Sequence, residues 1–132
     1  MTGTDWLRIA EESFDAAKVA FENGLHRSCV SRAYYAMYQA ATAIFVHAGV
    51  PVPPRGNWNH PDVARLFENP AVRRLLDRMR RRPLYMKRAM KTVYRARLEA
   101  DYGPRVTIHA AMARDARRFA GEFLSLARNA AS

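Results

Sequence analysis

An arginine and an aspartate set four positions apart are the residues of this chain best suited to hold a charged ligand. Arg97 and Asp101 belong to the run YRARLEADYG, residues 94–103, and a helix would place them on one side. The pair could be a purely structural ion pair, although an arginine N-terminal to its aspartate is the weaker order. Alternatively, Arg97 could hold a phosphate while Asp101 keeps its guanidinium in place.

Other patterns of catalytic or metal-binding residues are missing from the sequence. None of the four histidines forms a metal-ligand spacing with another histidine, a cysteine or a helical acid. They are His26, His47, His60 and His109. There is no glycine-rich phosphate loop, no serine nucleophile elbow and no acid pair of the glycosidase kind. We therefore expect neither a metal nor a cofactor.

The positive charge is concentrated in one segment. The net charge is +10, and residues 73–97 hold eleven Lys or Arg with Asp77 as the one acid. Such a surface is typical of nucleic-acid binding, although an acidic protein partner or a solvated helix face would also fit. The candidate contact residues are Arg78, Arg80, Arg81, Arg82, Lys87, Arg88, Lys91 and Arg95, with Arg73 and Arg74 adding to the field. A duplex-DNA binder is disfavoured, because no clear helix-turn-helix pair is present.

These residues must be positioned by helices. The stretch from Ser28 to Ala48 is apolar around most of its circumference, which predicts a buried central helix. It carries an alanine stripe and a group of tyrosines, Tyr34, Tyr35 and Tyr38, which we expect to be core or dimer contacts, with base stacking as the alternative. A first helix is predicted from Asp5 to Glu22, capped by Thr4 or Asp5 and ended by Gly24.

The second half of the chain is divided by prolines and glycines. Residues 51–61 form a Pro-rich loop in which Trp58 could cover the core, and residues 62–82 form a short helical, Arg-rich insert. Within the insert, helical segments are predicted from Pro61 to Asn69 and from Ala71 to Arg82. A long helix is predicted from Pro83 to Tyr102, where Gly103-Pro104 ends it. A last helix is predicted from Thr107 almost to Ser132.

The predicted fold is all-α. No β-type alternation and no internal repeat occur, so we expect a four-helix up-and-down bundle with a short helical insert between the second and third main helices. Its 132 residues fit a single domain. One cysteine, Cys29, excludes an internal disulfide, and neither a membrane-length apolar run nor a secretory signal is visible. These features favour a cytoplasmic protein without a membrane partner.

Two runs together resemble the HEPN superfamily of small all-α domains. They are SRAYYAMYQAATAIF, residues 31–45, which follows an amphipathic helix closing on Gly24, and YRARLEADYG, followed by a capped last helix. The resemblance extends from about Thr4 to Arg128. It implies a homodimer, RNA as the target, and a toxin or defence role beside a nucleotidyltransferase-like antitoxin. Many such domains are implied to be metal-independent endoribonucleases.

The family motif is an arginine followed after four to six residues by a histidine, and this chain departs from it. Arg97 matches the arginine, but Tyr102 occupies the histidine's place. A tyrosine with a pKa near ~10 is a poor general base at neutral pH. Tyr102 could instead donate a hydrogen bond or be modified with AMP by the partner, while Asp101 holds Arg97. His109 or His60 could restore an imidazole. The alternative function is a non-catalytic homodimeric module that binds a nucleotide, nucleic acid or acidic protein.

Overall fold

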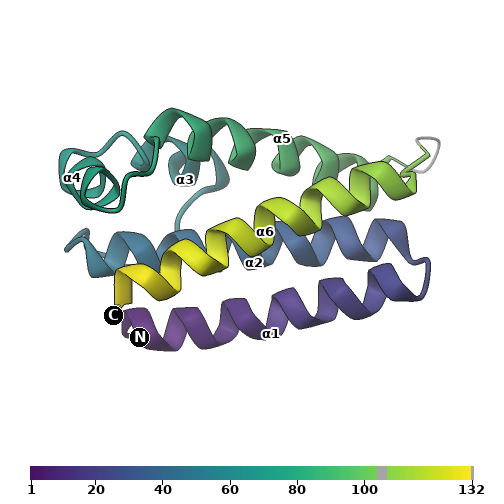
Figure 1. The fold of residues 1–132 in the computed structure, drawn as a ribbon, viewed down its shortest axis with the longest axis horizontal. Helices are drawn as coiled ribbons and strands as arrows, with labels where there is room; N and C mark the ends of the chain where they lie inside the picture. The colour runs from purple at the N-terminus through teal and green to yellow at the C-terminus, as the bar shows by residue number, and fades with distance from the viewer. Residues whose placement is uncertain (104–106, 132) are drawn as a thin grey trace.

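Six helices make up the part of the chain that the computed structural model describes, residues 1–103 and 107–131. Their bounds are α1 (Gly3–Glu22), α2 (His26–His47), α3 (His60–Leu66), α4 (Pro70–Arg78), α5 (Pro83–Tyr102) and α6 (Ala110–Ala131). The four long helices alternate in direction, and the short α3 and α4 lie at one end of the bundle, between α2 and α5 in chain order (Figure 1). The predicted all-α bundle with a helical insert is confirmed.

Helix α2 is the central element, as its apolar circumference predicted. Thirteen of its 22 residues are buried, and it packs against α1, α5 and α6. The alanines at 33, 36, 40 and 43 are no more than 4% exposed, so their small side chains let neighbouring helices approach closely. Cys29 is also fully buried, in agreement with a packed residue. The core built around α2 fixes one wall of the site described below.

Several helix ends differ from the prediction, each for a local reason. Thr2, rather than Thr4 or Asp5, caps α1, because its hydroxyl accepts from the amide of Asp5 and the Asp5 carboxylate accepts from the amide of Thr2. Helix α4 ends at Arg78, four residues early. Arg80 adopts a left-handed φ of 58° there, and the amide of Arg81 donates to the carbonyl of Leu76.

The last two long helices show which signals define a boundary. Helix α5 runs from Pro83 to Tyr102 as predicted, with the amide of Gly103 donating to the carbonyl of Glu99; Pro104 lies outside the described residues. Helix α6 begins at Ala110 instead of Thr107. The carbonyl of His109 accepts the first helical bonds of α6, so the predicted threonine cap is wrong.

Candidate functional site

The guanidinium of Arg97 is buried and held from two sides. Arg97 is 8% exposed, and its Nη2 donates to the hydroxyl of Tyr35 at 2.7 Å. Its Nε lies 2.9 Å from Oδ2 of Asp101, but the N–H is not aligned with the carboxylate, so this contact is an ion pair without a well-formed hydrogen bond. Nη1 has no hydrogen-bond partner within residues 1–103 and 107–131, which leaves that nitrogen for a ligand.

Aromatic rings surround the same guanidinium. Its carbon lies 5.9 Å from the ring centre of Tyr34, 5.3 Å from that of Tyr35 and 5.4 Å from that of Tyr102, within the range of cation–π attraction. Burial alone would lower the pKa of Arg97, but Tyr35, Asp101 and Tyr102 together raise it above the ordinary value. Arg97 therefore stays charged although it is largely buried, and partial burial strengthens its interaction with an anion.

Contacts between α2 and α5 bring these residues together. The hydroxyl of Ser31 lies 3.4 Å from Oδ2 of Asp101. Arg27 donates to the backbone carbonyls of Glu99, Ala100 and Gly103, and so caps the C-terminal end of α5. The runs 31–45 and 94–103 thus meet face to face. An arginine at the end of a helix also suits the negative pole of the helix dipole.

A histidine from outside both runs joins this cluster. Nδ1 of His60 is hydrogen-bonded to the hydroxyl of Tyr34 at 2.5 Å, and its ring stacks on Tyr94 with 5.2 Å between ring centres. Burial lowers the pKa of His60, and the positive charge of Arg97 lowers it further. His60 is therefore a neutral imidazole at neutral pH, and Tyr34 stands between it and Arg97.

The Pro-rich loop is anchored just before His60. The hydroxyl of Tyr38 donates to the carbonyl of Trp58 at 2.6 Å and accepts from the amide of Trp58 at 2.7 Å. The Trp58 ring is buried against Phe45, with 5.9 Å between ring centres, which confirms that Trp58 covers the core. Because this anchor lies two residues before His60, it fixes where α3 begins and where the imidazole lies.

A groove of about 450 Å³ opens beside this histidine, between α3 and α5. Its floor is apolar, and its rim carries basic side chains. The lining residues are His60, Pro61, Ala64, Arg65, Lys87, Met90, Lys91, Tyr94 and Arg95. Tyr94 is three residues before Arg97 on α5, so one helix carries both a wall of the groove and the central residue of the Arg97 cluster.

Comparison with known proteins decides the family. The model of the HEPN domain matches residues 4–130, nearly the whole chain. This chain belongs to the HEPN domain family. Two archaeal relatives share part of the sequence. The protein named "Putative toxin MJ0605" from Methanocaldococcus jannaschii is 46% identical over 52 residues, 33% of this chain. "UPF0332 protein PH1297" from Pyrococcus horikoshii is 39% identical over 61 residues, 46% of this chain. The matched part covers 39% of each relative.

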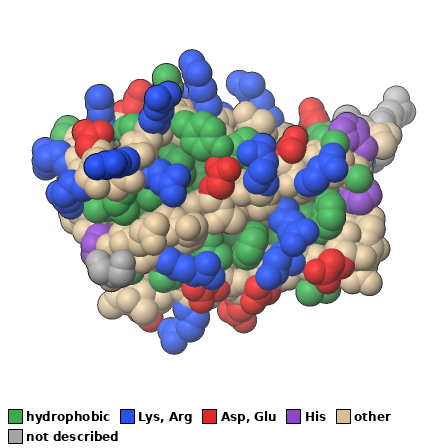
Figure 2. Space-filling model, in the orientation of Figure 1, with side chains coloured by type: hydrophobic (Ala, Val, Ile, Leu, Met, Phe, Trp, Pro, Cys, Tyr) green, Lys and Arg blue, Asp and Glu red, His purple; other side chains and the backbone are tan. Residues whose placement is uncertain are grey.

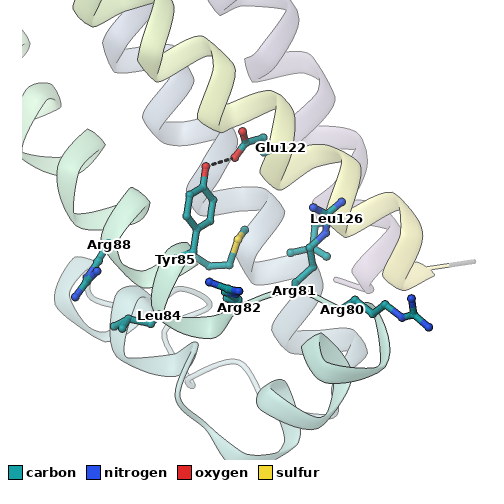
Figure 3. A pocket seen from close by; sticks show the side chains of 9 residues that line it. Arg80, Arg81, Arg82, Leu84, Tyr85, Arg88, Glu122 and Leu126 are labelled. Carbon is teal, nitrogen blue, oxygen red and sulfur yellow. Dashed lines mark hydrogen bonds between the residues drawn. The ribbon is translucent and has the colours of Figure 1, made fainter.

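The basic residues of this HEPN domain do not gather at one point. Lys and Arg side chains crowd over α4 and the start of α5 (Figure 2). Lys87, Lys91 and Arg95 line the groove beside His60, whereas Arg80, Arg81, Arg82 and Arg88 line a second pocket, together with Tyr85 and Glu122. There the guanidinium groups are spread apart, and the Tyr85 hydroxyl donates to Glu122 at 2.7 Å (Figure 3). Arg73, Arg74 and Arg78 are exposed on α4.

Tyr102 and His109 occupy different surroundings. Tyr102 is 69% exposed, so its hydroxyl is accessible, while the face of its ring lies over Arg97. His109 is exposed before α6, and no contact with the Arg97 cluster is found among the residues described. Of the two histidines proposed to restore an imidazole, His60 is the one that the fold brings to the cluster.

Ser31, Tyr34 and Tyr35 are residues of the site that the sequence did not reveal as such. The tyrosines are predicted to be core or dimer contacts, with base stacking as the alternative, and Tyr34 is indeed fully buried. A usable signal was present, because three hydroxyl residues share one side of the central helix within four positions.

Across the described ranges, no group of three His, Cys, Asp or Glu could hold a metal ion. No helix in those ranges has the length and apolarity needed to cross a bilayer.

Proposed function

We propose that this HEPN protein is a toxin-like, RNA-acting component of a toxin–antitoxin or defence pair. Its partners would be RNA, a second copy of the chain and a nucleotidyltransferase-like antitoxin. Membership of the HEPN family and the name of the Methanocaldococcus relative support the toxin-like role. The excess of basic residues between Arg73 and Arg97 supports RNA as the ligand. The compartment would be the cytoplasm, where RNA is available.

The observation that carries this proposal is the state of Arg97. Tyr35 and Asp101 hold its guanidinium in one orientation, and Nη1 is left without a partner in the described ranges. A fixed, charged and largely buried donor is suited to a phosphate oxygen, and it would stabilise charge that develops there during transesterification. The exposed hydroxyl of Tyr102 lies beside it as a second donor, or as the site that a partner modifies.

The alternative is a non-catalytic homodimeric interaction module. One observation favours it: the exposed position that would carry the motif histidine holds Tyr102, and a tyrosine is a poor proton acceptor at neutral pH. In that case Arg97 and the basic surface would bind a nucleotide, nucleic acid or acidic protein without cleaving it.

RNA cleavage by the purified protein in EDTA separates the two functions. Wild type is compared with Arg97→Lys, Arg97→Ala and Tyr102→Phe, each checked for folding by circular dichroism. Cleavage that is lost in Arg97→Ala and only partly retained in Arg97→Lys would support a metal-independent ribonuclease with a guanidinium–phosphate contact. Loss in Tyr102→Phe would add a role for the hydroxyl. A folded wild type that binds RNA without cleaving it would support the interaction module.

A further inference from the structure

We propose that the groove between α3 and α5 binds one nucleotide unit of single-stranded RNA, with Nε2 of His60 donating to a phosphate oxygen and Lys91 and Arg95 neutralising the backbone. This inference rests on the proposed function, since it takes RNA as the ligand. It goes further by locating the strand and by giving His60 a direct contact.

The protein itself pairs only part of the positive charge on the rim of the groove. Arg65 is paired with Asp62 at 2.6 Å, and Lys87 is paired with Glu68 at 3.0 Å. Lys91 and Arg95, by contrast, are exposed and form neither a hydrogen bond nor an ion pair with any described residue. They are four residues apart on α5, so both point to one side of the helix. Two adjacent cations without a close ion pair are suited to successive phosphates.

The floor of the groove is suited to a base. It is formed by Pro61, Ala64, Met90 and the half-buried Tyr94. A volume of about 450 Å³ is in the range of small-ligand pockets. It favours a single unstacked nucleotide over a duplex, because bases paired inside a duplex cannot reach an apolar pocket.

The hydrogen bond between Tyr34 and His60 determines what His60 offers to this ligand. Tyr34 is fully buried, and in the described part of the chain its hydroxyl has no other partner than Nδ1 of His60. A buried hydroxyl needs an acceptor, so Tyr34 donates and Nδ1 accepts. The proton of the neutral imidazole is then on Nε2. Nε2 has no hydrogen-bond partner among the described residues, and the His60 side chain lines the groove. His60 thus presents an N–H donor, which is suited to a phosphate oxygen.

Tyr34 and Tyr94 connect the wall of the groove to the Arg97 cluster by packing contacts. The ring of Tyr34 lies 5.4 Å from the ring of His60 and 5.9 Å from the guanidinium carbon of Arg97. Tyr94 contacts both His60 and Tyr34. His60 in the groove and Arg97 therefore contact the same buried tyrosine, although Arg97 itself does not line the groove.

Binding of a fluorescent oligoribonucleotide of about eight residues tests the location. The double variant Lys91→Gln/Arg95→Gln is compared with Arg74→Gln/Arg78→Gln, an equally charged, exposed pair with the same spacing on α4. We expect the groove variant to weaken binding at least about tenfold and the α4 variant less than about threefold. Equal losses in both would overturn the inference while leaving RNA binding intact. Absence of wild-type binding at low salt would overturn the proposed function as well.

Titration of the His60 imidazole by NMR tests the contact itself on the wild-type protein. A phosphate at Nε2 stabilises the imidazolium, so addition of the oligoribonucleotide should raise the pKa of His60, by about one unit or more. His60→Gln should keep more affinity than His60→Ala, because the glutamine amide can still donate near the position of Nε2. An unchanged pKa of His60 at saturating RNA would overturn the contact. Tighter binding of the same sequence as a duplex would overturn the single-strand assignment.

Discussion

At the scale of single residues, Arg97 has a structural role that any functional experiment must separate from ligand binding. Its guanidinium is buried among Tyr34, Tyr35 and Asp101. From the sequence, Arg97 could form a structural ion pair with Asp101 or bind a phosphate. The ion pair is present, and Nη1 of Arg97 has no hydrogen-bond partner among the described residues, so the two interpretations are compatible.

Arg97→Ala should lower the free energy of unfolding by about 2–4 kcal/mol. The substitution leaves Asp101, whose side chain is 27% exposed, without its partner, and it removes the contacts with three rings. Arg97→Lys should cost roughly half as much, because it keeps the charge but not the planar fork. Urea unfolding followed by circular dichroism measures both. The control is Leu98→Ala at the adjacent, exposed position, expected within about 1 kcal/mol; a similar value for Arg97→Ala would argue against a structural pair.

His60 should make stability depend on pH. Its pKa is lowered in the folded protein from the ordinary value of 6.5, so the unfolded chain binds more protons just below that pH. The stabilisation is present above about pH 6.5 and is lost as the pH falls through the folded pKa, by about 1.4 kcal/mol per unit of pKa difference. Urea unfolding at about pH 7.5 and about pH 5.5 should show this loss, and His60→Gln should reduce it. An identical pH dependence in both proteins would contradict the neutral, partly buried imidazole.

At the scale of elements, the sequence predicted best where prolines and glycines mark a boundary. Helix α5 lies between Pro83 and Gly103, and both of its ends were predicted correctly. The helix ends that were predicted incorrectly depend on which of several suitable residues forms the cap. For α1, both Thr2 and Thr4 could cap the helix from their residue type alone, and the structure uses Thr2. The position of His60 was also beyond prediction, because it depends on the long-range contact between Tyr38 and Trp58.

Tyr38→Phe should destabilise the fold by about 2–3 kcal/mol. It leaves the buried amide and carbonyl of Trp58 without the one hydroxyl that satisfies both. Hydrogen exchange should also become faster in residues 51–60, since the anchor before α3 is lost. Tyr85→Phe is the matched control, because it removes a hydroxyl whose bond to Glu122 is exposed, and it should cost less than about 1 kcal/mol. Equal costs would show that the anchor contributes little.

Arg80→Gly should stabilise the protein, by about 1 kcal/mol. Arg80 occupies the position after α4 where the backbone is left-handed, with φ at 58°, and glycine takes this conformation without the steric cost of a Cβ atom. Thermal or urea unfolding measures the change. Arg81→Gly, one residue on and without a positive φ, should instead destabilise slightly, since glycine there only adds freedom to the unfolded chain. Destabilisation by Arg80→Gly would mean that its side chain contributes more than the backbone strain costs.

At the scale of the whole molecule, the fold could be predicted almost completely from the sequence, but the site only in part. Periodicity and turn residues determine helices and their order, whereas a site depends on which faces meet. Arg97, Asp101 and Tyr102 were found because they lie within six residues of one helix, where Arg97 and Tyr102 match the spacing of the family motif. Ser31, Tyr34 and Tyr35 come from α2 and His60 from α3, and only packing of α2, α3 and α5 brings these residues to Arg97.

The distribution of charge over the molecule determines how RNA affinity should depend on salt concentration. In the sequence, the basic residues between 73 and 97 form one continuous segment. In the fold, these residues lie on α4, on the turn before α5 and along α5. If Lys91 and Arg95 each neutralise one phosphate of a single strand, replacing both by Gln should reduce the slope of log affinity against log salt by about 1.4, at about 0.7 per contact. Arg74→Gln/Arg78→Gln should leave the slope nearly unchanged, because distant charges contribute to the field without releasing counterions at a fixed contact. Fluorescence anisotropy across a salt series measures both slopes. The same reduction in both variants would mean that RNA is bound by the net charge of the whole face and that the groove has no special part in it.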